Sequence, residues 1–188
     1  MGGKIWVESE EGKGSEFIFT LKLGQIIPAS KREISPPQLD KIKDNKVVIV
    51  DANYSTRDTI KSYCFELGLK ILYSASSATE VVDWLQSETK MPDIILCDIM
   101  MPDMDGCEVA KILTEEKKFK GIKLIGTSSY SIPGAEKIAQ ALKFDAYLSM
   151  PIAKEDLVKI IQATMYPIKG GKKGIITKKL AEELAFKE

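Results

Sequence analysis

Residues 93–106 read DIILCDIMMPDMDG, and this stretch decides the fold. An apolar run of the kind found in buried strands stops at Asp98, and a loop containing proline and glycine follows it. A carboxylate at the end of a strand fit for the core is either the cap of a turn or part of a working site. The patterns on both sides of the stretch separate these two interpretations.

Apolar runs and helical patterns alternate five times across residues 46–166. Connections this short favour parallel strands with right-handed crossovers and helices on both faces of the sheet. We therefore expect an α/β fold, a doubly wound five-stranded parallel sheet. The expected strands are 46–50, 70–75, 93–98, 122–128 and 145–150, and the expected helices are 55–67, 78–89, 105–116, 134–143 and 154–165.

The carboxyl ends of these strands carry polar side chains. Asp51 follows the first strand, Asp98 ends the third, Thr127 lies at the end of the fourth, and Met150 precedes a proline after the fifth. Sites in such sheets form beyond the carboxyl ends of the strands. Two carboxylates at one edge suit a hard cation such as Mg²⁺, and a carboxylate beside such a cation can attack a phosphoryl group. The sequence therefore predicts an acidic site at this edge.

The composition argues against several other classes of protein. Lysine plus arginine and aspartate plus glutamate both total 27, and only two of the basic residues are arginines, so we expect no nucleic-acid partner. Histidine is absent, which excludes a phosphohistidine on this chain. Three cysteines without metal-ligand spacing indicate reduced thiols and a cytoplasmic location. No apolar run approaches the ~20 residues that span a bilayer, so we expect no membrane contact.

The segments outside residues 46–166 have a different character. Residues 1–23 alternate apolar and polar side chains around Gly12-Lys13-Gly14, which predicts a β-hairpin that needs a partner surface. Residues 24–45 contain three prolines and many charges, and we interpret them as a linker that contains at most a short helical turn. Residues 167–188 are expected to form a Gly/Lys-rich linker and a short helix toward a further domain.

Four motifs together resemble the receiver domain of two-component response regulators: VVIVDAN with Arg57 following, DIILCDIMMPDMDG, IGTSS and DAYLSMPI. The resemblance covers roughly residues 45–166 and implies a flavodoxin-like fold with Asp98 as the phosphoacceptor. It also implies that Thr127 is the switch hydroxyl and Tyr147 the switch aromatic residue. The implied Mg²⁺ ligands are Asp51, Asp98 and the backbone carbonyl of Met100.

The sequence departs from the receiver pattern at two positions. Receivers carry two acids after the first strand, but here Ala52 replaces the second, so Mg²⁺ is expected to bind weakly or not at all. Met150 stands where the family has a lysine before the proline, and it cannot donate a charged hydrogen bond to a phosphoryl oxygen. These departures favour a pseudo-receiver that acts by docking, with impaired phosphorylation at Asp98.

The flanks add a second resemblance. The hairpin MGGKIWVESEEGKGSEFIFTLKL looks like the closing hairpin of a histidine-kinase ATP-binding domain, and IITKKLAEE is similar to the joint before another receiver in tandem hybrid kinases. The resemblance implies a piece of a hybrid sensor kinase whose partners are the kinase core and a neighbouring receiver, with a small-molecule regulator as a further candidate. The phosphorylated histidine and the ATP site lie outside this chain, which leaves its own enzymatic activity undecided.

Alternatives remain open at several positions. The chain could instead be a working receiver that takes a phosphoryl group from phosphohistidine onto Asp98 with Mg²⁺. A flavin-binding flavodoxin ranks last because DANYSTRD contains no glycine for a phosphate loop. Asp98 could simply cap a turn, Asp51 and Asn53 could cap the first helix, and Met150 is also an expected packing residue.

Overall fold

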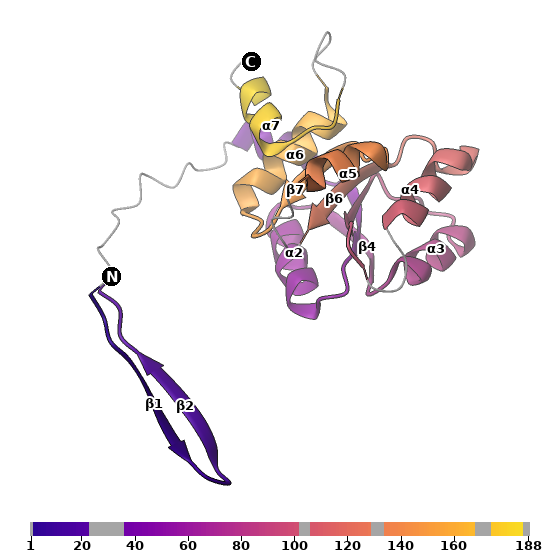
Figure 1. Ribbon diagram of the computed structural model, residues 1–188. Coiled ribbons are helices and arrows are strands. Elements are labelled where there is room, and N and C mark those ends of the chain that lie inside the picture. The colour runs from indigo at the N-terminus through magenta and orange to yellow at the C-terminus, as the bar shows by residue number, and fades with distance from the viewer. Residues whose placement is uncertain (1, 23–35, 102–105, 129–133, 168–173, 186–188) are drawn as a thin grey trace. The chain divides into compact units, whose positions relative to one another are not determined.

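The computed structural model of the protein describes residues 2–22, 36–101, 106–128, 134–167 and 174–185 (Figure 1). The chain divides into two compact units, residues 1–33 and residues 34–188. In the described ranges no helix has the length and apolar character needed to cross a membrane. Asp103 and Asp105, which follow the predicted acceptor, lie outside the described residues.

The first unit is the predicted hairpin. Strand β1 (Ile5–Glu10) pairs antiparallel with β2 (Gly14–Phe19). The register sets Ile5 opposite Phe19 and Val7 opposite Phe17, so that alternation places these four side chains on one face. All four are exposed. An antiparallel pair with an open apolar face has little of its own to hold it together.

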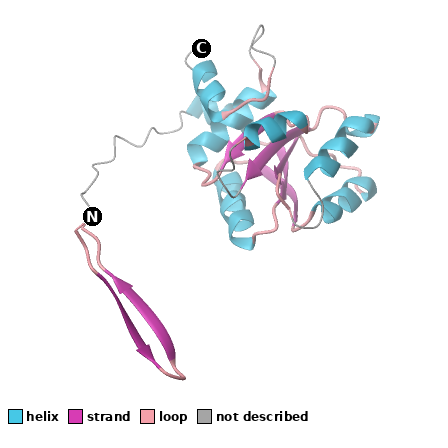
Figure 2. Ribbon diagram, viewed as in Figure 1, coloured by secondary structure: helices cyan, strands magenta, loops and turns pink. Residues whose placement is uncertain are grey.

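The second unit contains a five-stranded sheet with the order β4-β3-β5-β6-β7, and every neighbouring pair is parallel (Figure 2). This order confirms the predicted doubly wound fold. The strands are β3 (Lys46–Val50), β4 (Lys70–Ala75), β5 (Ile94–Asp98), β6 (Lys123–Ser128) and β7 (Ala146–Ser149).

One helix follows each strand of the sheet, and each helix begins and ends within two residues of its predicted position. They are α2 (Tyr54–Glu66), α3 (Ala78–Ser87), α4 (Gly106–Glu115), α5 (Ala135–Ala141) and α6 (Lys154–Met165). A short 3-10 turn, Lys117–Phe119, follows α4 and buries Phe119.

The sheet separates two apolar cores. Successive side chains of β3 alternate between them, because a strand points neighbouring side chains to opposite faces. Val48 and Val50 join the core beneath α3, α4 and α5, whereas Val47 and Ile49 join the core beneath α2 and α6. Because β3 lies inside the sheet and is buried on both faces, its sequence from Val47 to Val50 is a continuous apolar run. The side chains of Leu157, Ile160 and Ile161 in α6 are fully buried in the core beneath α2 and α6.

Two further helices pack against α6. Helix α1 (Pro36–Ile42) buries Ile42, and α7 (Lys178–Ala185), drawn in yellow in Figure 1, buries Ala181. Both side chains belong to the core beneath α2 and α6. The compact unit therefore extends beyond the predicted receiver range of 46–166 at both ends.

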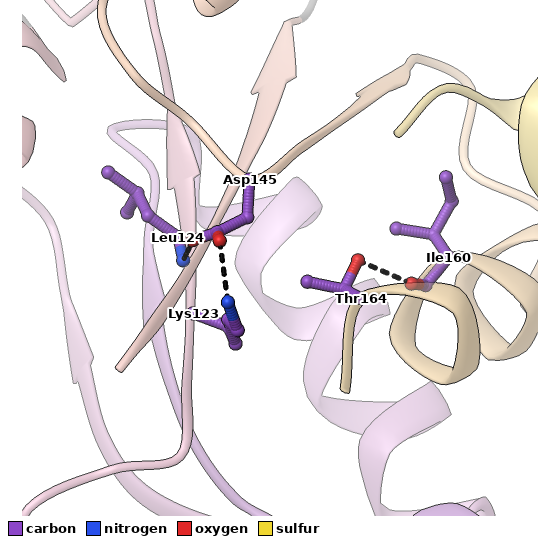
Figure 3. A network of polar contacts seen from close by, with 5 residues as sticks. All are labelled: Lys123, Leu124, Asp145, Ile160 and Thr164. Carbon is purple, nitrogen blue, oxygen red and sulfur yellow. Dashed lines mark hydrogen bonds and ion pairs between the residues drawn. The ribbon is translucent and has the colours of Figure 1, made fainter. Parts of the chain in front are cut away.

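Asp145 ties β6 to the start of β7 (Figure 3). Its carboxylate accepts hydrogen bonds from Lys123 Nζ at 2.8 Å and from the Leu124 backbone N–H at 2.9 Å. In α6, the buried Thr164 hydroxyl donates to the Ile160 carbonyl at 2.6 Å. The Asp145 bonds thus hold the start of β7 to β6 in addition to the backbone hydrogen bonds between the strands, whereas the Thr164 bond lies within α6.

Candidate functional site

The strand register brings the predicted acidic residues together. Val50 of β3 pairs with Cys97 of β5, so the next residues, Asp51 and Asp98, lie beside each other. Asp98 also pairs directly with Thr127 of β6. The Ile99 N–H donates to the Thr127 carbonyl at 2.9 Å, which extends this pairing past the strand end. Asp51, Asp98 and Thr127 are buried, with exposed fractions of 1%, 5% and 1%. The predicted edge therefore holds two buried carboxylates and a buried hydroxyl.

Only one of the two carboxylate oxygens of Asp51 accepts a hydrogen bond from the described residues. Its Oδ1 accepts the Asn53 backbone N–H at 2.7 Å, whereas its buried Oδ2 has no hydrogen-bond partner among the residues that the structure describes. Burial raises the pKa of Asp51 above its ordinary range, the charge of Asp98 raises it further, and the Asn53 bond and the Arg57 charge oppose this shift. A buried carboxylate oxygen without a donor is suited to a cation.

Asp98 is positioned by the turn that follows β5. The Met100 N–H donates to Asp98 Oδ1 at 3.0 Å, and the Met100 side chain is half exposed. Neighbouring Cys97 is fully buried, and burial raises the pKa of its thiol strongly, so it is an inert core residue. The side chain of Cys107 lies outside the described residues.

The loop between β3 and α2 has its own anchors. Asn53 is the N-cap of α2, and its side chain accepts the Thr56 N–H at 3.1 Å, which confirms the predicted capping role for Asn53. Asp51 does not cap the helix, because its carboxylate accepts from Asn53 instead. Arg57 Nη1 donates to the backbone carbonyls of both Asp51 and Ala52. This arginine therefore holds the loop that carries Asp51.

The two unusual positions have ordinary surroundings. Ala52 is exposed beside Asp51. Met150 is half-buried and packs against the core beneath α2 and α6, as predicted for a methionine at this position. Its N–H donates to the Ser128 carbonyl at 3.1 Å, and the Met150–Pro151 peptide bond is cis. Position 150 is thus held by an apolar side chain that contributes to packing.

Tyr147 lies one strand away from Thr127. Its side chain is buried in the core beneath α3, α4 and α5, and burial raises the pKa of its hydroxyl, while a hydrogen bond with Ser128 opposes that shift. The charge of Asp98 also acts on the Tyr147 hydroxyl. The charges of Glu136 and Asp98 both raise the pKa of the Tyr147 hydroxyl, so Tyr147 lies within electrostatic reach of the predicted acceptor.

Among the described residues, the site contains the two carboxylates of Asp51 and Asp98. Across the described ranges, no group of three or more histidine, cysteine, aspartate or glutamate side chains is arranged to hold a metal ion. The two acids Asp51 and Asp98, with a backbone carbonyl, could offer oxygen ligands of the kind that Mg²⁺ prefers. Position 52 is an alanine and offers no carboxylate.

The chain is similar to proteins of a known family. The model of the family described as "Response regulator receiver domain" matches residues 47–162. The chain belongs to this family. The receiver domain is 26% identical over 116 residues to response regulator Rre1 of Synechocystis sp., a match that covers 62% of this chain and 49% of Rre1.

Two relatives of the receiver domain are named as kinases. Sensor histidine kinase AtsR of Burkholderia thailandensis is 27% identical over 166 residues, which cover 85% of this chain and 26% of AtsR. Sensor histidine kinase CheAY of Helicobacter pylori is 28% identical over 122 residues, which cover 65% of this chain and 15% of CheAY. The chain thus spans about half of Rre1 and much smaller parts of the two kinases.

Solved structures support the fold of the receiver domain. A response regulator receiver protein from Burkholderia phymatum has a TM-score of 0.59 at 24% identity, covering 65% of this chain and 95% of that one. A CheY-like receiver domain from Methanospirillum hungatei has a TM-score of 0.56 at 24% identity, covering 65% and 94%. Both similarities concern the arrangement of strands and helices.

Sequence reasoning missed two residues that shape the site. Gly126 precedes Thr127, and a Cβ atom there would lie 2.9 Å from Ile99 Cγ2 and 3.0 Å from the Phe144 ring. Ser128 is fully buried and faces Tyr147 through a hydrogen bond. The signal for Gly126 was present, because a glycine inside a strand often marks a close approach of neighbouring groups.

Proposed function

We propose that this receiver domain is a pseudo-receiver of a hybrid histidine kinase, which regulates the kinase by docking and accepts phosphate poorly at Asp98. The observation that carries the proposal is the contrast within the site. Asp98 and Asp51 are buried side by side, while the neighbouring positions hold an exposed Ala52 and an apolar, packed Met150. The acceptor is retained and two charges around it are lost.

The residues of the site fit a divalent cation, but with few charges. Asp51, with its unpartnered Oδ2, would hold Mg²⁺ together with Asp98 and the Met100 carbonyl. When bound, such a cation neutralises charge on a phosphoryl group that is being transferred. Because Mg²⁺ gives up its water reluctantly, two carboxylates in place of three weaken its binding. We therefore expect a weak site.

The loss at Met150 acts on the same developing charge. A charge-assisted hydrogen bond contributes roughly 1.5–3 kcal/mol, about one to two powers of ten in a rate or an equilibrium constant. Met150 supplies no such donor, and its side chain packs into the core instead. The effects of Ala52 and Met150 need not add, since both concern the charge at Asp98.

The flanking segments support placement within a longer kinase. The similarity to AtsR covers 85% of this chain, more than the residues 47–162 that the family model matches. We propose that the hairpin is the last one of a kinase ATP-binding domain. The kinase core and a neighbouring receiver of the same cytoplasmic protein are then the docking partners, and a small molecule is a candidate regulator.

A working phosphoacceptor is the second candidate. It is favoured by Asp98, which pairs directly with Thr127 at the strand ends, and by the resemblance, which implies that Thr127 and Tyr147 are switch residues. In this alternative, a phosphoryl group passes from the phosphohistidine of a kinase to an Asp98 oxygen, and the histidine is released. The two candidates differ in whether Ala52 and Met150 prevent this reaction.

Intact-mass analysis after incubation of the full chain with acetyl phosphate and Mg²⁺ separates the two candidates. The pseudo-receiver proposal predicts little or no phosphoryl adduct on the wild-type chain. It predicts an adduct when Ala52→Asp and Met150→Lys are combined, and loss of that adduct when Asp98→Asn is added. A stoichiometric wild-type adduct that Asp98→Asn removes would overturn the proposal and support the working phosphoacceptor.

A further inference from the structure

The guanidinium of Arg57 is held at the carboxyl end of β3. Arg57 lies in the first turn of α2, and its side chain is half-buried. Its Nη1 donates to the Asp51 carbonyl and, at 3.1 Å, to the Ala52 carbonyl. A positive charge is therefore fixed to the loop that carries the first acid of the site.

Other groups around the loop favour the same position of this charge. The Arg57 Cζ atom lies 5.8 Å from the centroid of the Tyr54 ring, within the range of a cation–π interaction. Hydrogen bonds from the Ser76 N–H and the Tyr73 hydroxyl lower the pKa of Glu80 in α3, and the charge of Arg57 lowers it further. The aromatic ring and the Glu80 carboxylate thus both attract the guanidinium.

The charge of Arg57 also reaches the Asp51 carboxylate. Burial raises the pKa of Asp51, and the positive charge of Arg57 opposes this shift. Asp51 carries the Oδ2 atom that has no partner among the described residues and is suited to a cation. Like charges repel, and water and salt screen the repulsion less at a partly buried site than at the surface. A dication at Asp51 would therefore be repelled by Arg57.

The residue at position 52 determines how far this repulsion is offset. A carboxylate there would lie beside the carbonyl that Arg57 binds, and it would attract the guanidinium and the dication alike. Ala52 is exposed and has no charge. The positive charge of Arg57 is thus retained at a position where no acid offsets it.

We propose that Arg57 is a built-in cation of the site, which lowers the affinity of Asp51 and Asp98 for Mg²⁺ by charge repulsion. The inference rests on the proposed pseudo-receiver, in which Mg²⁺ binds weakly. It assigns the weak binding to two causes, a ligand missing at position 52 and a positive charge retained at position 57.

Mg²⁺ titration of the full chain separates the charge of Arg57 from its contacts with the loop. Arg57→Gln removes the charge and keeps a side-chain donor, whereas Arg57→Lys keeps the charge and loses the fork of donors. Lys61→Gln removes an equal charge one turn further along α2 and is the matched control. Amide NMR signals of residues 51–53 and 98–100 give the dissociation constants. We expect Arg57→Gln to bind Mg²⁺ at least about fivefold more tightly than wild type, and Arg57→Lys and Lys61→Gln to bind within about twofold of it.

A purely structural role of Arg57 predicts a different result. A loosened loop would weaken Mg²⁺ binding in Arg57→Gln, and weaker or unchanged binding would overturn the inference. Equal tightening in Arg57→Gln and Arg57→Lys would assign the gain to a freer loop and would also overturn it. Arg57→Met, which keeps an apolar stem, provides the same loss of charge if Arg57→Gln does not fold.

The proposed function fails on a separate measurement. A stoichiometric phosphoryl adduct on the wild-type chain would overturn the pseudo-receiver. The ratio of the Mg²⁺ dissociation constants of wild type and Arg57→Gln would still measure the repulsion, so the two failures are distinguishable.

Discussion

Asp51 and Asp98 end neighbouring parallel strands, and both are buried there. Their charges repel, and the charge of Asp98 contributes to the raised pKa of Asp51. The positive charge of Arg57 has the opposite effect and lowers the pKa of Asp51. The site therefore stores an electrostatic cost that a cation would relieve.

Asp51→Asn should stabilise the receiver domain in the absence of divalent cations. The substitution removes a buried charge and keeps an acceptor for the Asn53 N–H, so we expect a gain of about 1–2 kcal/mol in the free energy of unfolding at neutral pH. Urea denaturation in EDTA measures it. Asp58→Asn on the exposed side of α2 serves as the control and should change stability little. A loss of stability in Asp51→Asn would contradict the inferred cost.

The stability of the wild-type chain should depend on pH through Asp51. Its pKa in the folded state lies above the ordinary 3.8, so the folded state binds this proton more tightly than the unfolded chain does. The contribution of Asp51 to the free energy of unfolding is therefore fully present below its ordinary pKa, and it is lost as the pH rises through the pKa of the folded state. The stability advantage of Asp51→Asn over wild type should accordingly grow across this acidic range and then level off. Parallel pH profiles of the two proteins would count against a raised pKa.

Arg57→Ala should loosen the loop between β3 and α2. Two donated hydrogen bonds to backbone carbonyls are lost, and we expect a destabilisation of about 1–2 kcal/mol. The lost positive charge should also raise the pKa of Asp51 further, which shifts the pH dependence described above to higher pH. Denaturation at several pH values measures both effects. If Lys61→Ala, on the same helix, had equal effects, the role assigned to the Arg57 contacts would be wrong.

Gly126→Ala should destabilise the domain by overpacking. The added methyl group would meet Ile99 and the Phe144 ring at 3.0 Å or less, and such overpacking costs about 1–3 kcal/mol. Gly174→Ala is a matched control, because a Cβ atom there meets nothing within 4 Å. Thermal or urea unfolding of both variants gives the comparison. Similar stability of the two variants would show that Ile99 and Phe144 move aside easily.

Much of the fold could be predicted because local and global signals agree. Helix α6 covers the predicted residues 154–165, since its apolar stripe, acidic first turn and preceding proline all indicate the same element. The parallel sheet followed from strict alternation of strands and helices. The placement of Asp51, Asp98 and Thr127 at one edge followed from parallel strands, because their carboxyl ends share one edge of the sheet.

Contacts between distant segments could not be predicted in the same way. Ile175 and Ile176 stand between glycine, lysine and threonine, and so short a run reads as part of a linker. Only the position of β7 at the sheet edge lets Ile176 form a parallel bridge with Ala146. Likewise, Gly126 is critical because Phe144 and Ile99 pack across it, and no local pattern specifies those neighbours. Long-range packing decides these features.

The affinity for Mg²⁺ tests the central claim most directly. Titration of the full chain with Mg²⁺, followed by the amide NMR signals of residues 98–100, gives the dissociation constant for wild type, Ala52→Asp and the charge-matched control Ser62→Asp. We predict that Ala52→Asp binds at least tenfold more tightly than wild type, about 1.4 kcal/mol, and that Ser62→Asp binds like wild type. A wild-type affinity equal to that of Ala52→Asp would contradict the account.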